Sequence, residues 1–352
     1  MEQLAWRKTS MWKEIMEQPE VLEGCLQRNI SVTGDLTKYL NARKINAVYI
    51  AGRGTSDHAA IYAKYILELL TGIPVALAAP SIVTVYKRRL KLKNCLVIGI
   101  SQSGEAADVL EVVREGKLNG AVTLAVTNTP SSPLAQEAAF HLDCAAGPEL
   151  SVAATKTFTA QMILLAFFAA AWSDYPELKD ELAGVPEGIS SILKNVAGFT
   201  EAVERHRFIE ECFMLARGVN YAAALEAALK IQETSYVRAK AFAASDFFHG
   251  PIAMIERDIP VMALVPGGPS FDYMHGALRK LINRRMELLV VSDQNKALQL
   301  GSTGIRIPET GNDFISPFFC VTVFQMFACM LAVERGINPD RPRGLKKVTV
   351  TR

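Results

Sequence analysis

The sequence predicts an α/β fold made of two tandem domains, each a mainly parallel sheet flanked by helices in a flavodoxin- or Rossmann-like three-layer sandwich. Three observations lead to this prediction. The chain has 352 residues, more than one ordinary domain needs. Buried-type apolar strands alternate with helical patterns along most of it. Two strands end in an Arg-Gly pair followed by an Ala-rich helix, at Arg53-Gly54 and Arg217-Gly218, which indicates a duplicated unit.

The elements follow one another in a regular order. Helical spacing predicts N-terminal helices over 1–40, and a first domain then covers 41–180. Its strands are expected at 47–51, 74–78, 95–100, 122–126 and 140–143. The second domain covers 181–340, with strands at 212–215, 261–265, 288–291 and 305–307. Residues 341–352 form a tail that contains Gly344-Leu345-Lys346-Lys347-Val348.

The composition and charge of the chain argue against nucleic-acid-binding, secreted and membrane proteins. The formal net charge is +2, which offers no basic field for nucleic acid. The six cysteines are scattered without a C-x-x-C pair, as in a reducing compartment. The first residues lack the pattern of a secretory signal, and the longest apolar run, 162–172, is too short to cross a bilayer. We therefore expect a cytoplasmic protein with a small-molecule ligand and neither a nucleic-acid nor a membrane partner.

Two strand ends in the first domain carry small hydroxyl residues. Gly54-Thr55-Ser56 follows the strand at 47–51, and Ser101-Gln102-Ser103 follows the strand at 95–100. Such strand-to-helix turns direct backbone N–H groups and a helix dipole at one point, which suits a phosphate at the carboxyl edge of the sheet. The alternative is that these hydroxyls only cap helices. A dinucleotide site is less well supported, because Asp57 stands where the third glycine of that motif would be.

Charged residues in the second domain form another candidate site. Glu226, Lys230 and Glu233 stand at i, i+4 and i+7 of a helix predicted over 222–236, so they share one face. Ion pairs on a solvated face have the same spacing, but the rest of this helix is mainly Ala, Leu and Ile, which favours a polar cavity. His249 follows in the turn His249-Gly250-Pro251, where it is fixed and exposed. No His, Cys and carboxylate cluster with metal-ligand spacing is present, and no cofactor is expected.

These motifs, in this order, resemble those of the SIS (sugar isomerase) family of sugar-phosphate enzymes. The resemblance is closest to the isomerase half of glucosamine 6-phosphate synthase and to the SIS-type glucosamine-6-phosphate deaminases. It includes Val152-Ala153-Ala154-Thr155-Lys156 and the Leu345-Lys346-Lys347 tail. The chain begins Met1-Glu2, without the N-terminal cysteine of a glutaminase domain, so glutamine is not expected to be its ammonia donor. Ala106 stands where the synthase has a phosphate-contacting threonine.

The resemblance implies a role for each site residue. The phosphate and nearby sugar hydroxyls are held by Gly54, Thr55, Ser56, Ser101, Gln102 and Ser103, with a backbone contact from Val152. Glu233 moves a proton between C1 and C2, a transfer suited to a carboxylate partly removed from water, and Lys230 and Glu226 assist it. His249 opens the sugar ring from the partner subunit of a homodimer, and Lys347 forms a Schiff base.

The resemblance favours conversion of glucosamine 6-phosphate to fructose 6-phosphate and ammonia. Two alternatives remain open. One is a fructosamine-6-phosphate deglycase or another phosphosugar isomerase, which would use the same phosphate site. The other is a non-catalytic sugar-phosphate sensor, although such regulators usually pair one SIS domain with a basic recognition helix that is absent here.

Overall fold

The computed structural model describes residues 5–255, 259–282 and 286–347. Residues 348–352 of the predicted tail, including Val348, lie outside this part of the chain. The chain divides into two compact units. The first-sheet unit comprises 18–149, 156–186 and the tail from residue 345. The second-sheet unit comprises the chain up to residue 17, 150–155 and 187–344. The long helix of the N-terminal segment thus packs with the first sheet, whereas the short helices before it belong to the second-sheet unit.

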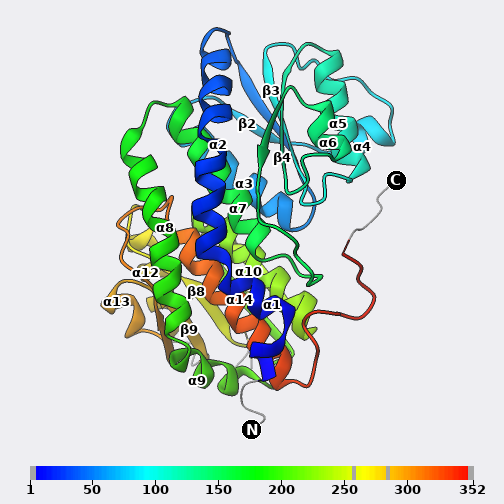
Figure 1. Cartoon of the computed structure of the whole chain (residues 1–352). Helices are drawn as coiled ribbons and strands as arrows, with labels where there is room; N and C mark the ends of the chain where they lie inside the picture. The colour runs from blue at the N-terminus through cyan, green and yellow to red at the C-terminus, as the bar shows by residue number, and fades with distance from the viewer. Residues whose placement is uncertain (1–4, 256–258, 283–285, 348–352) are drawn as a thin grey trace. The chain divides into compact units, whose positions relative to one another are not determined.

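The first sheet has five parallel strands in the order β2-β1-β3-β4-β5 (Figure 1). They are β1 (Ala47–Ala51), β2 (Val75–Leu77), β3 (Cys95–Ile100), β4 (Val122–Thr127) and β5 (Phe140–Asp143). β3 and β4 are buried along their whole length, because parallel strands in the middle of a sheet are covered on both faces. This burial explains why both read as continuous apolar runs.

Helices cover both faces of this sheet. Figure 1 shows α5 and α6 on one face, and α2, α3 and α7 on the other. α7 packs between α2 and α3, and nearly all of its residues are buried, which accounts for its apolar sequence. The helices of this unit are α2 (Gln18–Asn41), α3 (Thr55–Thr71), α4 (Ser81–Thr84), α5 (Ala107–Leu118), α6 (Pro133–Glu137) and α7 (Lys156–Trp172). α8 (Pro176–Lys194) spans the boundary between the two units.

The second sheet also has five parallel strands, in the order β10-β9-β8-β6-β7. They are β6 (Glu211–Ala216), β7 (Arg238–Ala243), β8 (Val261–Leu264), β9 (Leu288–Ser292) and β10 (Thr303–Arg306). Read from β7, this is the order of the first sheet, so the two units share one topology, the flavodoxin-like order 2-1-3-4-5. The predicted fold class and duplication are confirmed.

The edge strand β7 was missing from the sequence prediction. Arg238 and Lys240 are exposed, and Ala239 is the small residue between them. An edge strand exposes alternate side chains to water, so its hydrophobic signal is weak. Charged residues on such a strand are a common feature of sheet edges.

Helices α10 (Asn220–Ser235) and α14 (Ser316–Glu334) pack against each other in the second-sheet unit, and α10 contacts β6 and β7. The other elements of this unit are η1 (Ala5–Lys8), α1 (Ser10–Met16), α9 (Ala197–His206), α11 (Ala244–Phe247), η2 (Pro251–Met254), α12 (Phe271–Ile282) and α13 (Asn295–Leu298). α12 packs its apolar side chains on β8 and β9.

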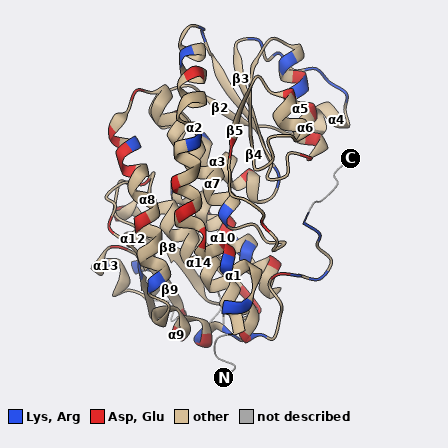
Figure 2. Cartoon of the chain, viewed as in Figure 1, with Lys and Arg blue, Asp and Glu red and all other residues tan. Residues whose placement is uncertain are grey.

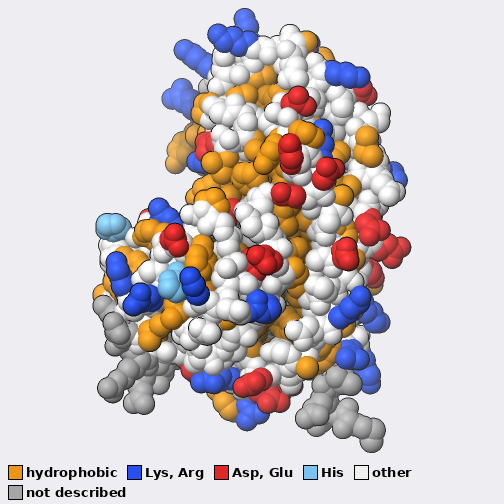
Figure 3. All heavy atoms as spheres, turned by 90° about the vertical axis from the view of Figure 1, so that its left-hand side faces the viewer, with side chains coloured by type: hydrophobic (Ala, Val, Ile, Leu, Met, Phe, Trp, Pro, Cys, Tyr) orange, Lys and Arg blue, Asp and Glu red, His pale blue; other side chains and the backbone are white. Residues whose placement is uncertain are grey.

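Among the described residues, α14 is the one helix long and apolar enough to cross a membrane by length and composition. Its most apolar window is 94% buried within the protein, and Figure 2 shows almost no charge along it. Core helices pass the same test, and packing against α10 accounts for its composition. All six cysteines are free and buried, as predicted. Both acidic and basic side chains are present on the face shown in Figure 3.

Candidate active site

The two hydroxyl-rich turns lie at the carboxyl ends of neighbouring strands in the first-sheet unit. Ala51 of β1 pairs in register with Gly99 of β3, so Arg53 and Ser101 each stand two residues past a paired position. Gly54, with φ of +53°, begins the turn into α3. Parallel strands bring such turns to one edge of the sheet, where open α/β folds bind ligands.

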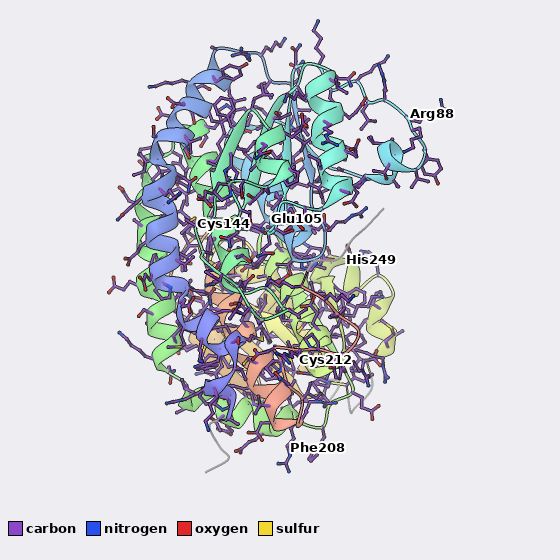
Figure 4. The ribbon with its side chains drawn as sticks, turned by 45° about the vertical axis from the view of Figure 1, so that its right-hand side comes forward. Arg88, Glu105, Cys144, Phe208, Cys212 and His249 are labelled. Carbon is purple, nitrogen blue, oxygen red and sulfur yellow. The ribbon has the colours of Figure 1, made fainter. Side chains whose placement is uncertain are left out.

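The hydroxyl residues of these turns do not occupy the N-cap positions of the helices that follow. The N-cap positions of α3 and α5 are taken by Gly54 and Ala106, neither of which makes a side-chain capping bond. Instead, the Ser101 hydroxyl accepts a hydrogen bond from the Gly104 N–H at 3.1 Å, and the Ser103 hydroxyl accepts one from the Glu105 N–H at 3.3 Å. Figure 4 marks Glu105 at the end of this turn. For Ser101 and Ser103, these hydrogen bonds lie within the turn before α5 and not at its N-cap.

Gly104 is required by its surroundings. A Cβ at this position would lie 2.0 Å from Ser132 Oγ, and φ is +68°, a conformation that favours glycine. Ser132 is itself the N-cap of α6, where it accepts a hydrogen bond from the Ala135 N–H. The turn after β3 is thus held tightly against the helix that follows β4.

A side chain of α7 supports Ser56, one of the predicted phosphate-binding residues. Ser56 is 7% exposed, and its hydroxyl accepts a hydrogen bond from Gln161 Nε2 at 3.2 Å. Gln161 is buried in α7 and escaped the sequence analysis, because a single amide in an apolar helix carries no signal of what it contacts. It holds the Ser56 hydroxyl in a fixed orientation.

Lys347 pairs with a residue that the sequence analysis missed. Its Nζ lies 3.0 Å from Glu149 Oε2, and the Glu149 side chain is fully buried. Glu149 also accepts hydrogen bonds from the Thr157 hydroxyl at 2.7 Å and the Thr157 N–H at 3.2 Å, in the first turn of α7. A carboxylate is well placed near a helix N-terminus. Glu149 therefore forms a rigid acceptor that docks the tail lysine within the first-sheet unit.

The charged stripe of α10 is buried in the second-sheet unit. Lys230 Nζ lies 3.3 Å from Glu226 Oε1 and 2.5 Å from Glu233 Oε2. The side chains of Lys230 and Glu226 are fully buried, whereas Glu233 is 21% exposed. The alternative of ion pairs on a solvated face is therefore wrong for this helix. Glu233 is the member of the trio that a ligand can reach.

Electrostatics keep Lys230 charged. Burial acts to lower its pKa, but the charges of Glu226 and Glu233 and their hydrogen bonds outweigh burial, so the pKa is raised above its usual value. The ammonium gives the exposed Glu233 a fixed counter-charge and a fixed direction. Lys230 can hold the carboxylate in place but is not suited to act as a nucleophile here.

The remaining candidates of the second-sheet unit are His249 and Val152, which lie outside α10. His249 is exposed in the turn between α11 and η2, where its N–H donates to the Asp246 carbonyl at 3.0 Å (Figure 4). Val152 lies in the segment 150–155, and its N–H donates to the Asp340 carbonyl at 3.4 Å. Because the Val152 N–H is used in this bond, the predicted backbone contact of Val152 with the substrate would be made by its carbonyl. Among the described residues, no group of three His, Cys, Asp or Glu side chains could hold a metal ion.

The fold is shared with known proteins. The model of the SIS domain family matches residues 42–171 and 210–335, one match on each sheet-forming half. The glutamine–fructose-6-phosphate aminotransferase (isomerizing) of Clostridium perfringens is 34% identical over 97% of this chain. The match covers 59% of that protein, so the chain spans about three-fifths of the length of such relatives.

Solved structures give the same result. The C-terminal domain of glucosamine-fructose-6-phosphate aminotransferase from Francisella tularensis superposes with a TM-score of 0.83 at 27% identity, covering 95% of this chain and 98% of that one. Glucosamine-6-phosphate deaminase from Thermotoga maritima gives a TM-score of 0.75 at 22% identity, covering 97% and 100% of the two chains. At this identity the deaminase shares the fold, and no more follows from the match.

Proposed function

Because the chain belongs to the SIS domain family and is homologous to the isomerase part of glutamine–fructose-6-phosphate aminotransferase, we propose that it is a deaminating isomerase of an amino-sugar phosphate. The proposed substrate is glucosamine 6-phosphate, and the products are fructose 6-phosphate and ammonia. The observation that carries this proposal is the buried trio of α10, which leaves one oriented carboxylate, Glu233, accessible to a ligand.

In this proposal the first-sheet unit binds the phosphate. The N–H groups and hydroxyls of Thr55, Ser56, Ser101 and Ser103, together with the Gln102 side chain, supply hydrogen bonds at the strand ends. Ser56 is already oriented by Gln161. Donors fixed before the ligand arrives lose little entropy on binding, which favours affinity.

Glu233 is the proposed base for the aldose–ketose step. In the open-chain sugar it takes the C2 proton, the electron pair forms a C1–C2 double bond, and O1 gains a proton, which gives an enolamine. Delivery of a proton to C1, with loss of a proton from the nitrogen, then gives the C2 ketimine. Water adds to C2 and ammonia leaves, so that glucosamine 6-phosphate and one water become fructose 6-phosphate and ammonia. Lys230 holds the Glu233 carboxylate in a fixed direction through their ion pair, as a positioned base requires.

His249 and Lys347 have the proposed roles of ring opening and Schiff-base formation. His249 is exposed on a tight turn, which suits a side chain donated to a partner subunit, and we propose a homodimer on this basis. Lys347 is held by Glu149, a carboxylate that can receive its proton when the amine attacks a carbonyl. A cytoplasmic location fits the six free, buried thiols.

The test measures ammonia release coupled to fructose 6-phosphate formation from glucosamine 6-phosphate. The wild type is expected to form both products in equal amounts, and Glu233→Gln to lose about 10²–10⁴-fold in rate, the usual contribution of a general base. Glu204→Gln, an exposed carboxylate of α9 in the same unit, is the matched control and should retain full activity.

Two results would point elsewhere. Turnover of a fructosamine 6-phosphate in place of glucosamine 6-phosphate would establish the deglycase. Binding of a sugar phosphate without any turnover would establish the sensor.

A further inference from the structure

One cation stands within the two turns of the first-sheet unit. Between residues 52 and 58 and between 101 and 108, the single Lys or Arg is Arg53. The β1–β3 register places Arg53 and Ser101 at the same distance past paired residues of neighbouring strands. Arg53 therefore belongs to the edge of the sheet that carries the hydroxyls of the proposed phosphate site, although no role was assigned to it above.

The Arg53 side chain is tied across the two turns. Its Nε lies 2.6 Å from Asp108 Oδ2, in the first turn of α5, the helix that follows the Ser101 turn. The Asp108 side chain is 4% exposed, and its other oxygen accepts a hydrogen bond from the Val109 N–H at 2.9 Å. A buried carboxylate anchored on its own helix thus fixes one edge of the guanidinium.

The opposite edge of the guanidinium is accessible. Arg53 is 52% exposed, and a guanidinium carries five N–H donors in a planar fork, of which Nε–H uses one. The two terminal nitrogens are suited to bidentate contact with phosphate oxygens. The Arg53 guanidinium is thus fixed by Asp108 through Nε, while its terminal nitrogens can donate hydrogen bonds to a ligand.

The local charges explain why the site needs this cation. The hydroxyls of the turns are neutral, whereas Asp57 and Asp108 are carboxylates that would repel a phosphate. Burial raises the pKa of Asp57, and the charges of His58 and Arg53 act in the opposite direction, so the field of Arg53 reaches both carboxylates. Ala106, at the N-cap of α5, adds no side-chain donor.

We infer that Arg53 binds the phosphate group of the sugar substrate directly and that Asp108 positions its guanidinium for this contact. The inference rests on the proposed function, since it concerns the phosphate site of that reaction. It makes Arg53 the residue by which the protein distinguishes a phosphorylated sugar from its parent sugar.

The experiment compares binding of glucitol 6-phosphate and glucitol by calorimetry. Neither probe has a carbonyl, so turnover cannot intervene. Hydrogen bonds to charged groups contribute about 1.5–3 kcal/mol, so Arg53→Met should weaken glucitol 6-phosphate binding about ten- to hundredfold. Arg53→Lys, which keeps the charge but loses the fork, should fall between the two. Binding of glucitol should change little.

Arg28→Met is the matched control, because Arg28 forms the same kind of pair in the same unit, with Nε 2.9 Å from Asp143 and a 62% exposed side chain. It should bind glucitol 6-phosphate as the wild type does. Equal binding by wild type and Arg53→Met would overturn the role of Arg53 while leaving the proposed function intact. No binding of any sugar phosphate by the wild type would overturn both. Should Arg53→Met fail to fold, Arg53→Lys decides by the ratio of the two affinities.

Discussion

Replacing Lys230 by methionine tests whether the buried trio of α10 depends on its central charge. Lys230 and Glu226 are fully buried, with Nζ and Oε1 3.3 Å apart. At an effective dielectric constant of about 20, two unit charges at this distance attract each other by about 5 kcal/mol, part of which is offset by loss of hydration. Methionine fills a similar volume but leaves Glu226 as a buried charge without its ammonium. Removing one partner of a buried pair typically costs about 3–5 kcal/mol, so we expect a loss of this size in the free energy of unfolding.

Urea unfolding followed by circular dichroism measures this loss. The double variant Lys230→Met with Glu226→Gln removes the stranded charge and should recover a large part of the stability. Lys194→Met, an exposed lysine of α8, is the control and should lie within about 0.5 kcal/mol of the wild type. A Lys230→Met protein as stable as the wild type would refute the reasoning, as would a double variant less stable than the single one.

Three further predictions concern other residues. Glu149→Gln removes the carboxylate that pairs with Lys347. Borohydride trapping of fructose 6-phosphate on Lys347, measured by mass spectrometry, should therefore fall in this variant and be partly restored in Glu149→Asp. Unchanged trapping would contradict the docking role of Glu149. Burial raises the pKa of Asp313, so its folded-state penalty is absent below about pH 3.8 and grows as pH rises through the folded pKa. Asp313→Asn should therefore raise the thermal midpoint above that of the wild type, and this increase should be larger at pH 7 than at pH 4. An equal increase at both pH values would contradict this. Gly104→Ala should cost at least about 1–3 kcal/mol, because of its positive φ and the close approach of Ser132, and an unchanged thermal midpoint would count against the tight turn.

The sequence predicted most of the fold because its central strands are buried on both faces. β3 and β4 read as uninterrupted apolar runs between helical patterns, and their bounds were predicted to within a residue. β7 was missed because an exposed edge strand with Arg238 and Lys240 has no such run. The hydrophobic signal identifies central strands and fades at the edges of a sheet.

Some residues of the candidate site could be predicted from the sequence, and others could not. Glu226, Lys230 and Glu233 could be grouped from their spacing, because a helix fixes which residues share a face. Glu149 could not be predicted as the partner of Lys347, since 198 residues separate them and only the folded chain brings them together. Asp108 and Gln161 could not be predicted as partners of Arg53 and Ser56 for the same reason, since each pair is far apart in the sequence. Local motifs indicate candidate site residues, whereas the partners that hold those residues in place are found only in the structure.

The most direct test of the proposed function follows the hydrogen on C2 of the sugar. Glucosamine 6-phosphate deuterated at C2 would be incubated with the protein, and the products analysed by nuclear magnetic resonance. If Glu233 carries out the aldose–ketose step, deuterium leaves C2 and is found at C1 of fructose 6-phosphate or in water, and Glu233→Gln leaves it in place. Ammonia release with deuterium retained at C2 of the recovered sugar phosphate would contradict the isomerase mechanism.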